Sequence, residues 1–112
     1  MMIRFPATRN KFSNKWTEYN GINYQSKLEA SFAEVLDWQV RAKEITGSEH
    51  QVPVKLIVNG VLICKLIVDF RVEHLDASYE FVEAKGMALP DWKLKWKLFE
   101  ALFPEVRKRI VK

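Results

Sequence analysis

Apolar residues recur along this chain with two different periods, and the change of period marks where one kind of element gives way to another. From Ser26 onward the spacing is three and four residues, which predicts an amphipathic helix. Its expected inner face carries Leu28, Phe32, Val35, Leu36 and Gln39. Ser26 can cap this helix with Glu29 as its capping-box partner, and Gly47 is its expected end.

The middle of the chain is rich in β-branched residues, and its patterning predicts strands. Two strand-like runs, residues 52–58 and 61–72, flank Asn59-Gly60, a dipeptide typical of tight hairpin turns. A second turn is expected at residues 75–78 and a third strand at residues 79–85. These runs predict a sheet that is built from hairpins.

A second helix is expected near the end of the chain. Pro90 and Asp91 start it, and it continues to about Phe103, where Pro104 stops it. Residues 105–112 form a short strand or a short helix, and the sequence leaves this choice open. The order of helix, three strands and helix predicts an α/β (α+β) domain with a mixed sheet rather than a doubly wound one.

The chain length of 112 residues suits a single domain, which we expect to occupy residues 26–112. Residues 1–25 lack a steady period and are expected to form a basic N-terminal arm or a small hairpin around Asn20-Gly21. No apolar stretch approaches the roughly 20 residues that cross a bilayer. We therefore expect no membrane partner and a cytoplasmic location.

Charge is distributed unevenly along the chain, although the net charge is only +4. Residues 1–28 and residues 87–112 each carry a net charge of +4, whereas residues 29–86 carry −4. An acidic centre between two basic ends suits a metal site flanked by phosphate-binding surface. It suits a solvated domain with basic tails equally well, so charge alone does not choose between these interpretations.

Three charged residues stand in segments that should be apolar. Asp69 follows an apolar run, and Glu83 and Lys85 alternate within the third strand, so Glu83 and Lys85 should project from the same face. A buried charge is costly unless it is paired or binds a metal. Two carboxylates with an amine indicate a site for a hard divalent cation such as Mg²⁺, whereas the plain alternative is a surface salt bridge between Glu83 and Lys85.

Glu29 has two possible roles. It lies on the core-facing side of the first helix near its start, so it either caps the helix or joins the Asp69, Glu83 and Lys85 cluster. The sequence leaves both roles open.

These residues carry a resemblance to a known superfamily. Glu29 in the first helix, Asp69 at a strand end and Glu83-Ala84-Lys85 on the next strand resemble the PD-(D/E)xK nuclease superfamily, with its restriction-endonuclease-like core. The stretch from Tyr19 to Ala30, together with the two strand segments, is similar to small phage-encoded nucleases that include Holliday-junction resolvases. Val68 stands where the superfamily name has Pro, a departure that the chemistry tolerates.

The resemblance implies Mg²⁺- or Mn²⁺-dependent hydrolysis of DNA phosphodiester bonds. Asp69 and Glu83 would then be metal ligands, Glu29 a ligand or supporting carboxylate, and Lys85 the amine that positions water. It further implies duplex or branched DNA as partner, a homodimer, a role in phage replication or recombination, and the host cytoplasm as location.

Basic residues outside this cluster are candidates for phosphate contacts. They are Lys11 and Lys15 in the arm, Lys93 and Lys97 on one face of the second helix, and Arg107, Lys108 and Arg109 near the end. Trp92 and Trp96 belong to an aromatic stripe that forms core or a dimer interface, or else stacks on bases. The functional alternative to an endonuclease is a catalytically silent nucleic-acid-binding domain of the same fold.

Overall fold

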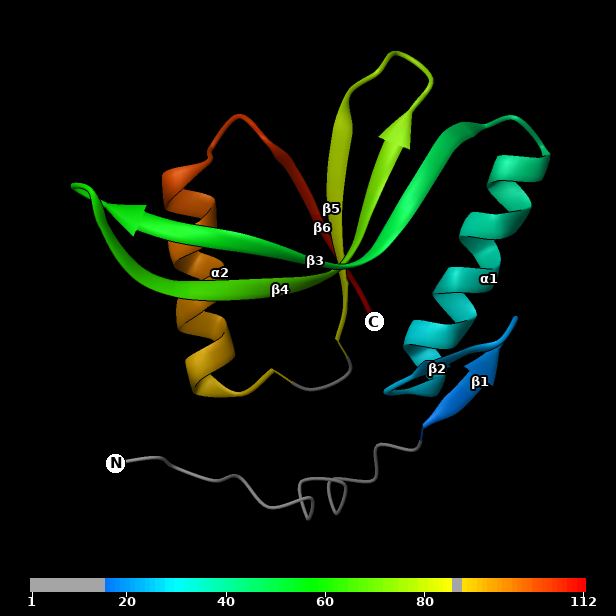
Figure 1. Ribbon diagram of the computed structural model, residues 1–112, viewed down its shortest axis with the longest axis horizontal. Coiled ribbons are helices and arrows are strands. Elements are labelled where there is room, and N and C mark those ends of the chain that lie inside the picture. The colour runs from blue at the N-terminus through cyan, green and yellow to red at the C-terminus, as the bar shows by residue number, and fades with distance from the viewer. Residues whose placement is uncertain (1–15, 86–87) are drawn as a thin grey trace.

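A long, bent β-hairpin lies at the centre of the molecule, with one helix on each side of the bend (Figure 1). The computed structural model describes residues 16–85 and 88–112. Within them the elements are β1 (Thr17–Tyr19), β2 (Ile22–Tyr24), α1 (Lys27–Arg41), β3 (Ile45–Val58), β4 (Val61–His74), β5 (Tyr79–Ala84), α2 (Pro90–Leu102) and β6 (Arg107–Val111).

The main sheet has four strands in the order β3-β4-β5-β6. β3 pairs with β4, and β4 with β5, in antiparallel fashion, whereas β6 is parallel to β5. A parallel pair needs a crossover connection, and α2 supplies it. The final element, which the sequence left open, is therefore a strand, and the α+β class with a mixed sheet is confirmed.

The predicted turns form where they were expected, and the one at residues 75–78 joins β4 to the antiparallel β5. Asn59 and Gly60 have φ angles of 50° and 78°, and Val58 pairs with Val61 across them. Two consecutive left-handed residues are the requirement of a type I′ turn, which explains the Asn-Gly pair. A smaller hairpin joins β1 to β2 around Asn20 and Gly21, which are also left-handed.

The first helix starts as predicted but ends earlier. The Ser26 side chain accepts a hydrogen bond from Glu29 N, so Ser26 is the N-cap. The helix ends at Arg41, and Lys43, with a φ of 60°, turns the chain into β3. Gly47 lies inside β3, so its predicted role as the helix end is wrong. The physical reason is that the apolar face is exhausted after Leu36, the last buried residue of α1.

Each helix covers its own hydrophobic cluster. The α1 cluster contains Phe32 and Leu36 with Phe70 and Val72 of β4, and Tyr24 of the small hairpin is buried in it as well. The predicted face was partly wrong, because Val35 is 46% exposed.

The α2 cluster is built on the aromatic stripe of that helix. Trp96 and Phe99 are buried against Leu66 and Val68 of β4, so the stripe forms core. β4 therefore contributes to both clusters. Asp69 lies between Val68, which belongs to the α2 cluster, and Phe70, which belongs to the α1 cluster.

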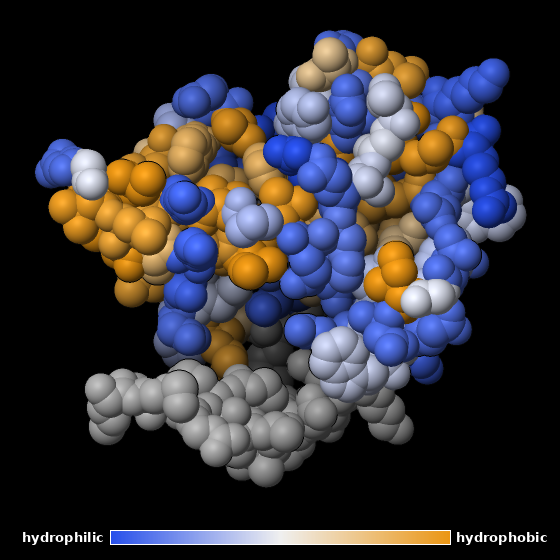
Figure 2. Space-filling view, viewed as in Figure 1, coloured by the Kyte–Doolittle hydropathy of each residue, from blue (hydrophilic) through white to orange (hydrophobic). Residues whose placement is uncertain are grey.

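The hairpin end distant from α1 carries apolar side chains on its outer surface. Figure 2 shows them gathered over the β3–β4 hairpin, and they include Ile57, Val61, Leu62, Ile63 and Ile67, each 45% to 59% exposed. Among the described residues, no helix combines the length and the apolar character needed to cross a membrane.

Candidate active site

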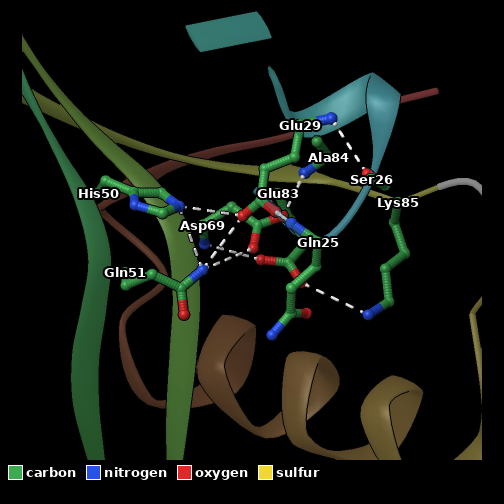
Figure 3. A network of polar contacts seen from close by, with 9 residues as sticks. All are labelled: Gln25, Ser26, Glu29, His50, Gln51, Asp69, Glu83, Ala84 and Lys85. Atoms are coloured by element: carbon green, nitrogen blue, oxygen red, sulfur yellow. Dashed lines mark hydrogen bonds and ion pairs between the residues drawn. The ribbon is translucent and has the colours of Figure 1, made fainter. Parts of the chain in front are cut away.

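β4 and β5 separate at the point where the two acidic residues face each other. The last paired residues of this ladder are Phe70 and Val82, and the next positions along the strands are Asp69 and Glu83. Here Asp69 N donates to Glu83 Oε1 at 3.0 Å, and Ala84 N donates to Asp69 Oδ2 at 2.9 Å. Each carboxylate is thus held by the backbone of the other strand, as Figure 3 shows.

Burial makes these carboxylates costly to ionise. Desolvation raises the pKa of Asp69 from 3.8 to about 8, helped by the nearby charges of Glu83 and Glu29 and opposed by the Ala84 N–H. Desolvation also raises the pKa of Glu83, which is only 3% exposed. The hydrogen bond from the Asp69 N–H and the charge of Lys85 partly oppose this rise. Two such groups side by side favour the binding of a cation.

Lys85 is the cation nearest to Glu83 among the described side chains. Its Nζ lies 3.7 Å from Glu83 Oε2 and 5.1 Å from the ring centroid of Trp92. Because the Glu83 side chain is only 4% exposed, this is no ordinary surface salt bridge. Lys85 directly follows the last residue of β5, one residue short of the predicted strand end, and its side chain still lies beside Glu83, as expected.

Glu29 combines both of the roles that the sequence left open. Its Oε1 accepts a hydrogen bond from Gln25 N at 3.0 Å, which satisfies the helix entry. Its Oε2 lies 3.1 Å from His50 Nε2 and accepts a hydrogen bond from Gln51 Nε2, also at 3.1 Å. One carboxylate oxygen thus serves the helix and the other faces the site.

Gln51 connects Glu29 to Asp69; from its place at the start of the first predicted strand it was a minor candidate for a supporting role and not one of the principal site residues. Its Nε2 also donates to Asp69 Oδ1 at 3.4 Å. The ladder between β3 and β4 passes from His50–Phe70 to Val52–Val68, and between these pairs Gln51 has a φ of 59°. A left-handed non-glycine residue inside a strand is strained, and such strain clusters at functional sites.

The indole of Trp92 closes the site on the α2 side. Its N–H lowers the pKa of Glu83, although the geometry of the buried Nε1 atom falls short of a hydrogen bond with any described residue. The indole therefore favours the charged form of Glu83.

The acidic side chains of the site form a pair rather than a larger cluster. Across residues 16–85 and 88–112, no group of three or more His, Cys, Asp or Glu side chains is arranged to hold a metal ion. Asp69 and Glu83 remain as a carboxylate pair. Mg²⁺ commonly uses only one or two protein carboxylates, with waters and substrate phosphate completing its shell.

Comparison with known proteins adds a family but no activity. A family model described as "Protein of unknown function (DUF1064)" matches residues 9–112. The chain belongs to the DUF1064 family. No curated protein matches it, and no solved structure matches it.

Two of the predicted phosphate-binding residues of this DUF1064 protein lie near the acidic site. Lys93 and Lys97 on α2 line a hollow that Lys85 also lines. Lys11 and Lys15 lie outside the described residues.

The three basic residues of β6 do not gather into one patch. Arg107 donates to Ser78, Lys108 donates to carbonyls that include that of Val106, and Arg109 pairs with Glu80 at 3.3 Å. Their side chains are therefore already engaged within the domain and do not join the acidic site.

Proposed function

We propose that this protein is a divalent-metal-dependent DNA endonuclease of the PD-(D/E)xK type, with a restriction-endonuclease-like core. The observation that carries the proposal is the pair of reciprocal hydrogen bonds that fixes the Asp69 and Glu83 carboxylates side by side, with Lys85 at 3.7 Å from Glu83. A chance motif would leave these side chains scattered over the surface.

The donor set fits a hard divalent cation. Asp69 and Glu83, with the Ala84 carbonyl, would hold Mg²⁺ or Mn²⁺, and both carboxyl groups are buried and lie next to each other. When bound, the ion would polarise the phosphodiester and acidify a water molecule.

The chain's own groups supply the remaining functions. The Lys85 ammonium orients the attacking water and offsets negative charge that develops on the phosphate. Gln51 is a positioning residue, because its amide donates to both Glu29 and Asp69 and thereby fixes the orientation of both carboxylates. The overall reaction is hydrolysis: a water oxygen bonds to phosphorus, the bond from phosphorus to one ester oxygen of the strand breaks, and that oxygen takes up a proton and leaves as a hydroxyl group.

The substrate that we propose is duplex or branched DNA, including Holliday junctions, cleaved in a phage-type replication or recombination setting. A homodimer would place two such sites on one branched substrate. The location would be the cytoplasm of the host cell.

The test is cleavage of labelled four-way junction, flap, linear duplex and single-stranded DNA in Mg²⁺, Mn²⁺ or EDTA. We expect metal-dependent cleavage, and we expect its rate to fall about 100-fold or more in Asp69→Asn and in Lys85→Ala. Glu34→Gln is the matched carboxylate control, because Glu34 is exposed on α1. Lys95→Ala is the matched lysine control, since Lys95 Nζ contacts only the Lys65 carbonyl among the described residues.

Two outcomes would refute the catalytic proposal. The first is cleavage that persists in folded Asp69→Asn protein, which would assign the activity to another site or to a contaminant. The second is DNA binding without cleavage under every metal condition, which would favour the catalytically silent nucleic-acid-binding domain.

A further inference from the structure

A lysine-rich hollow lies directly beside the acidic site. Its volume is about 520 Å³, and Lys85, Lys93, Lys97 and Lys112 line it together with Trp92 and Trp96. We call this feature the lysine hollow. Glu100 is its one acidic lining residue within the described part of the chain. The excess of positive charge indicates an anionic ligand.

The walls of the lysine hollow are of two kinds. Trp92 and Trp96 stack on each other with ring centroids 5.3 Å apart, and they form a preorganised apolar wall. Lys93 and Lys97 lie one turn apart on α2, and both are exposed. The start of α2 adds little to this charge, because the Asp91 carboxylate in its first turn accepts the Trp92 N–H at 2.9 Å.

The size of the hollow restricts the ligand. About 520 Å³ lies within the range of roughly 300 to 1,000 Å³ that holds small ligands, whereas a DNA duplex does not enter a recess of this size. An apolar wall beside several ammonium groups matches the sugar and base on one side of a nucleotide and its phosphate on the other. A single unpaired nucleotide satisfies both size and chemistry.

Lys85 connects the lysine hollow to the carboxylates. Its side chain lines the hollow, lies over the ring of Trp92 and forms an ion pair with Glu83. A nucleotide in the hollow therefore contacts the same ammonium group that faces the Asp69 and Glu83 pair.

We infer that the lysine hollow is a subsite for one unpaired nucleotide adjacent to the cleaved phosphate. This inference rests on the proposed nuclease function and narrows its substrate class to DNA with an unpaired or displaced strand at the cleavage point. Gapped and flapped DNA meet this requirement, whereas a continuous blunt duplex and a fully paired four-way junction do not.

The test compares binding of a flap DNA and a blunt duplex of equal length by fluorescence anisotropy in EDTA. We expect the Lys93→Ala/Lys97→Ala double variant to lose about tenfold in affinity for the flap and less than twofold for the blunt duplex. In a plot of the logarithm of the flap-binding constant against the logarithm of the salt concentration, the slope of the double variant should be shallower by about 1.4. This is the change expected for the loss of two single-strand phosphate contacts. Lys95→Ala should bind both substrates as the wild type does.

A second measurement separates a nucleotide from a simple anion. Thymidine 5′-monophosphate, thymidine and inorganic phosphate are titrated while the indole N–H resonances of Trp92 and Trp96 are followed by NMR. We expect saturable shifts with the nucleotide that the double variant loses. Equal shifts with inorganic phosphate would reduce the hollow to an anion site and overturn the inference.

Failure of this inference is distinguishable from failure of the proposed function. Equal losses on flap and blunt duplex, or no loss on either, would overturn the subsite while wild-type cleavage still supported the nuclease. Selective flap binding by a wild-type protein that never cleaves would support the subsite and refute the nuclease.

Discussion

At the scale of single residues, the protein places a carboxyl group where its ionisation is most costly. The pKa of Asp69 is raised from 3.8 to about 8, so its proton stabilises the fold fully below about pH 4, and this stabilisation is lost as the pH rises through about 8. We expect metal-free Asp69→Asn to be more stable than the wild type at pH 9 by about 1–3 kcal/mol, because the amide carries no charge. Thermal unfolding in EDTA between pH 5 and pH 9 measures this, and parallel profiles for both proteins would contradict it.

At the scale of elements, the β3–β4 turn depends on backbone conformation rather than on space. Gly60 has a φ of 78°, and an added Cβ would meet nothing within 4 Å. We therefore expect Gly60→Ala to lower the free energy of unfolding by about 1–2 kcal/mol, because alanine is strained in the left-handed conformation. Gly47 in β3 is the control, because it also has open space but no positive φ, and Gly47→Ala should not destabilise. Urea unfolding of both variants gives the comparison. Equal losses would show that the turn does not need a left-handed residue.

At the scale of the whole molecule, cation binding and folding should be linked. An ion that binds only the folded state raises the free energy of unfolding by about 2.7 kcal/mol when its concentration is 100 times its dissociation constant. We expect Mg²⁺ or Mn²⁺ to raise the midpoint of thermal unfolding in the wild type and in Glu34→Gln, and to leave it unchanged in Asp69→Asn. A metal-induced shift that survives in Asp69→Asn would place the cation elsewhere.

The homodimer stays a prediction, and sedimentation equilibrium is its measurement.

The chain by itself determined those features that depend on neighbours in sequence. The Ser26 cap, the Asn59-Gly60 turn and the stop of α2 before Pro104 follow from local backbone preferences, and each forms as predicted. The spacing of two residues at the end of β5 likewise brings Glu83 and Lys85 together. Where α1 ends was less predictable, because the apolar face loses its packing partners before any residue interrupts the helix.

Tertiary structure alone decided how these elements meet. Nothing local to Gln51 predicts a φ of 59° or a side chain that links Glu29 to Asp69, because both depend on the pairing of β3 with β4 and on the packing of α1. The lysine hollow likewise requires α2 to bring Lys93 beside Lys85. Contacts between distant segments depend on register, bend and burial, which a one-dimensional pattern of residues leaves undetermined.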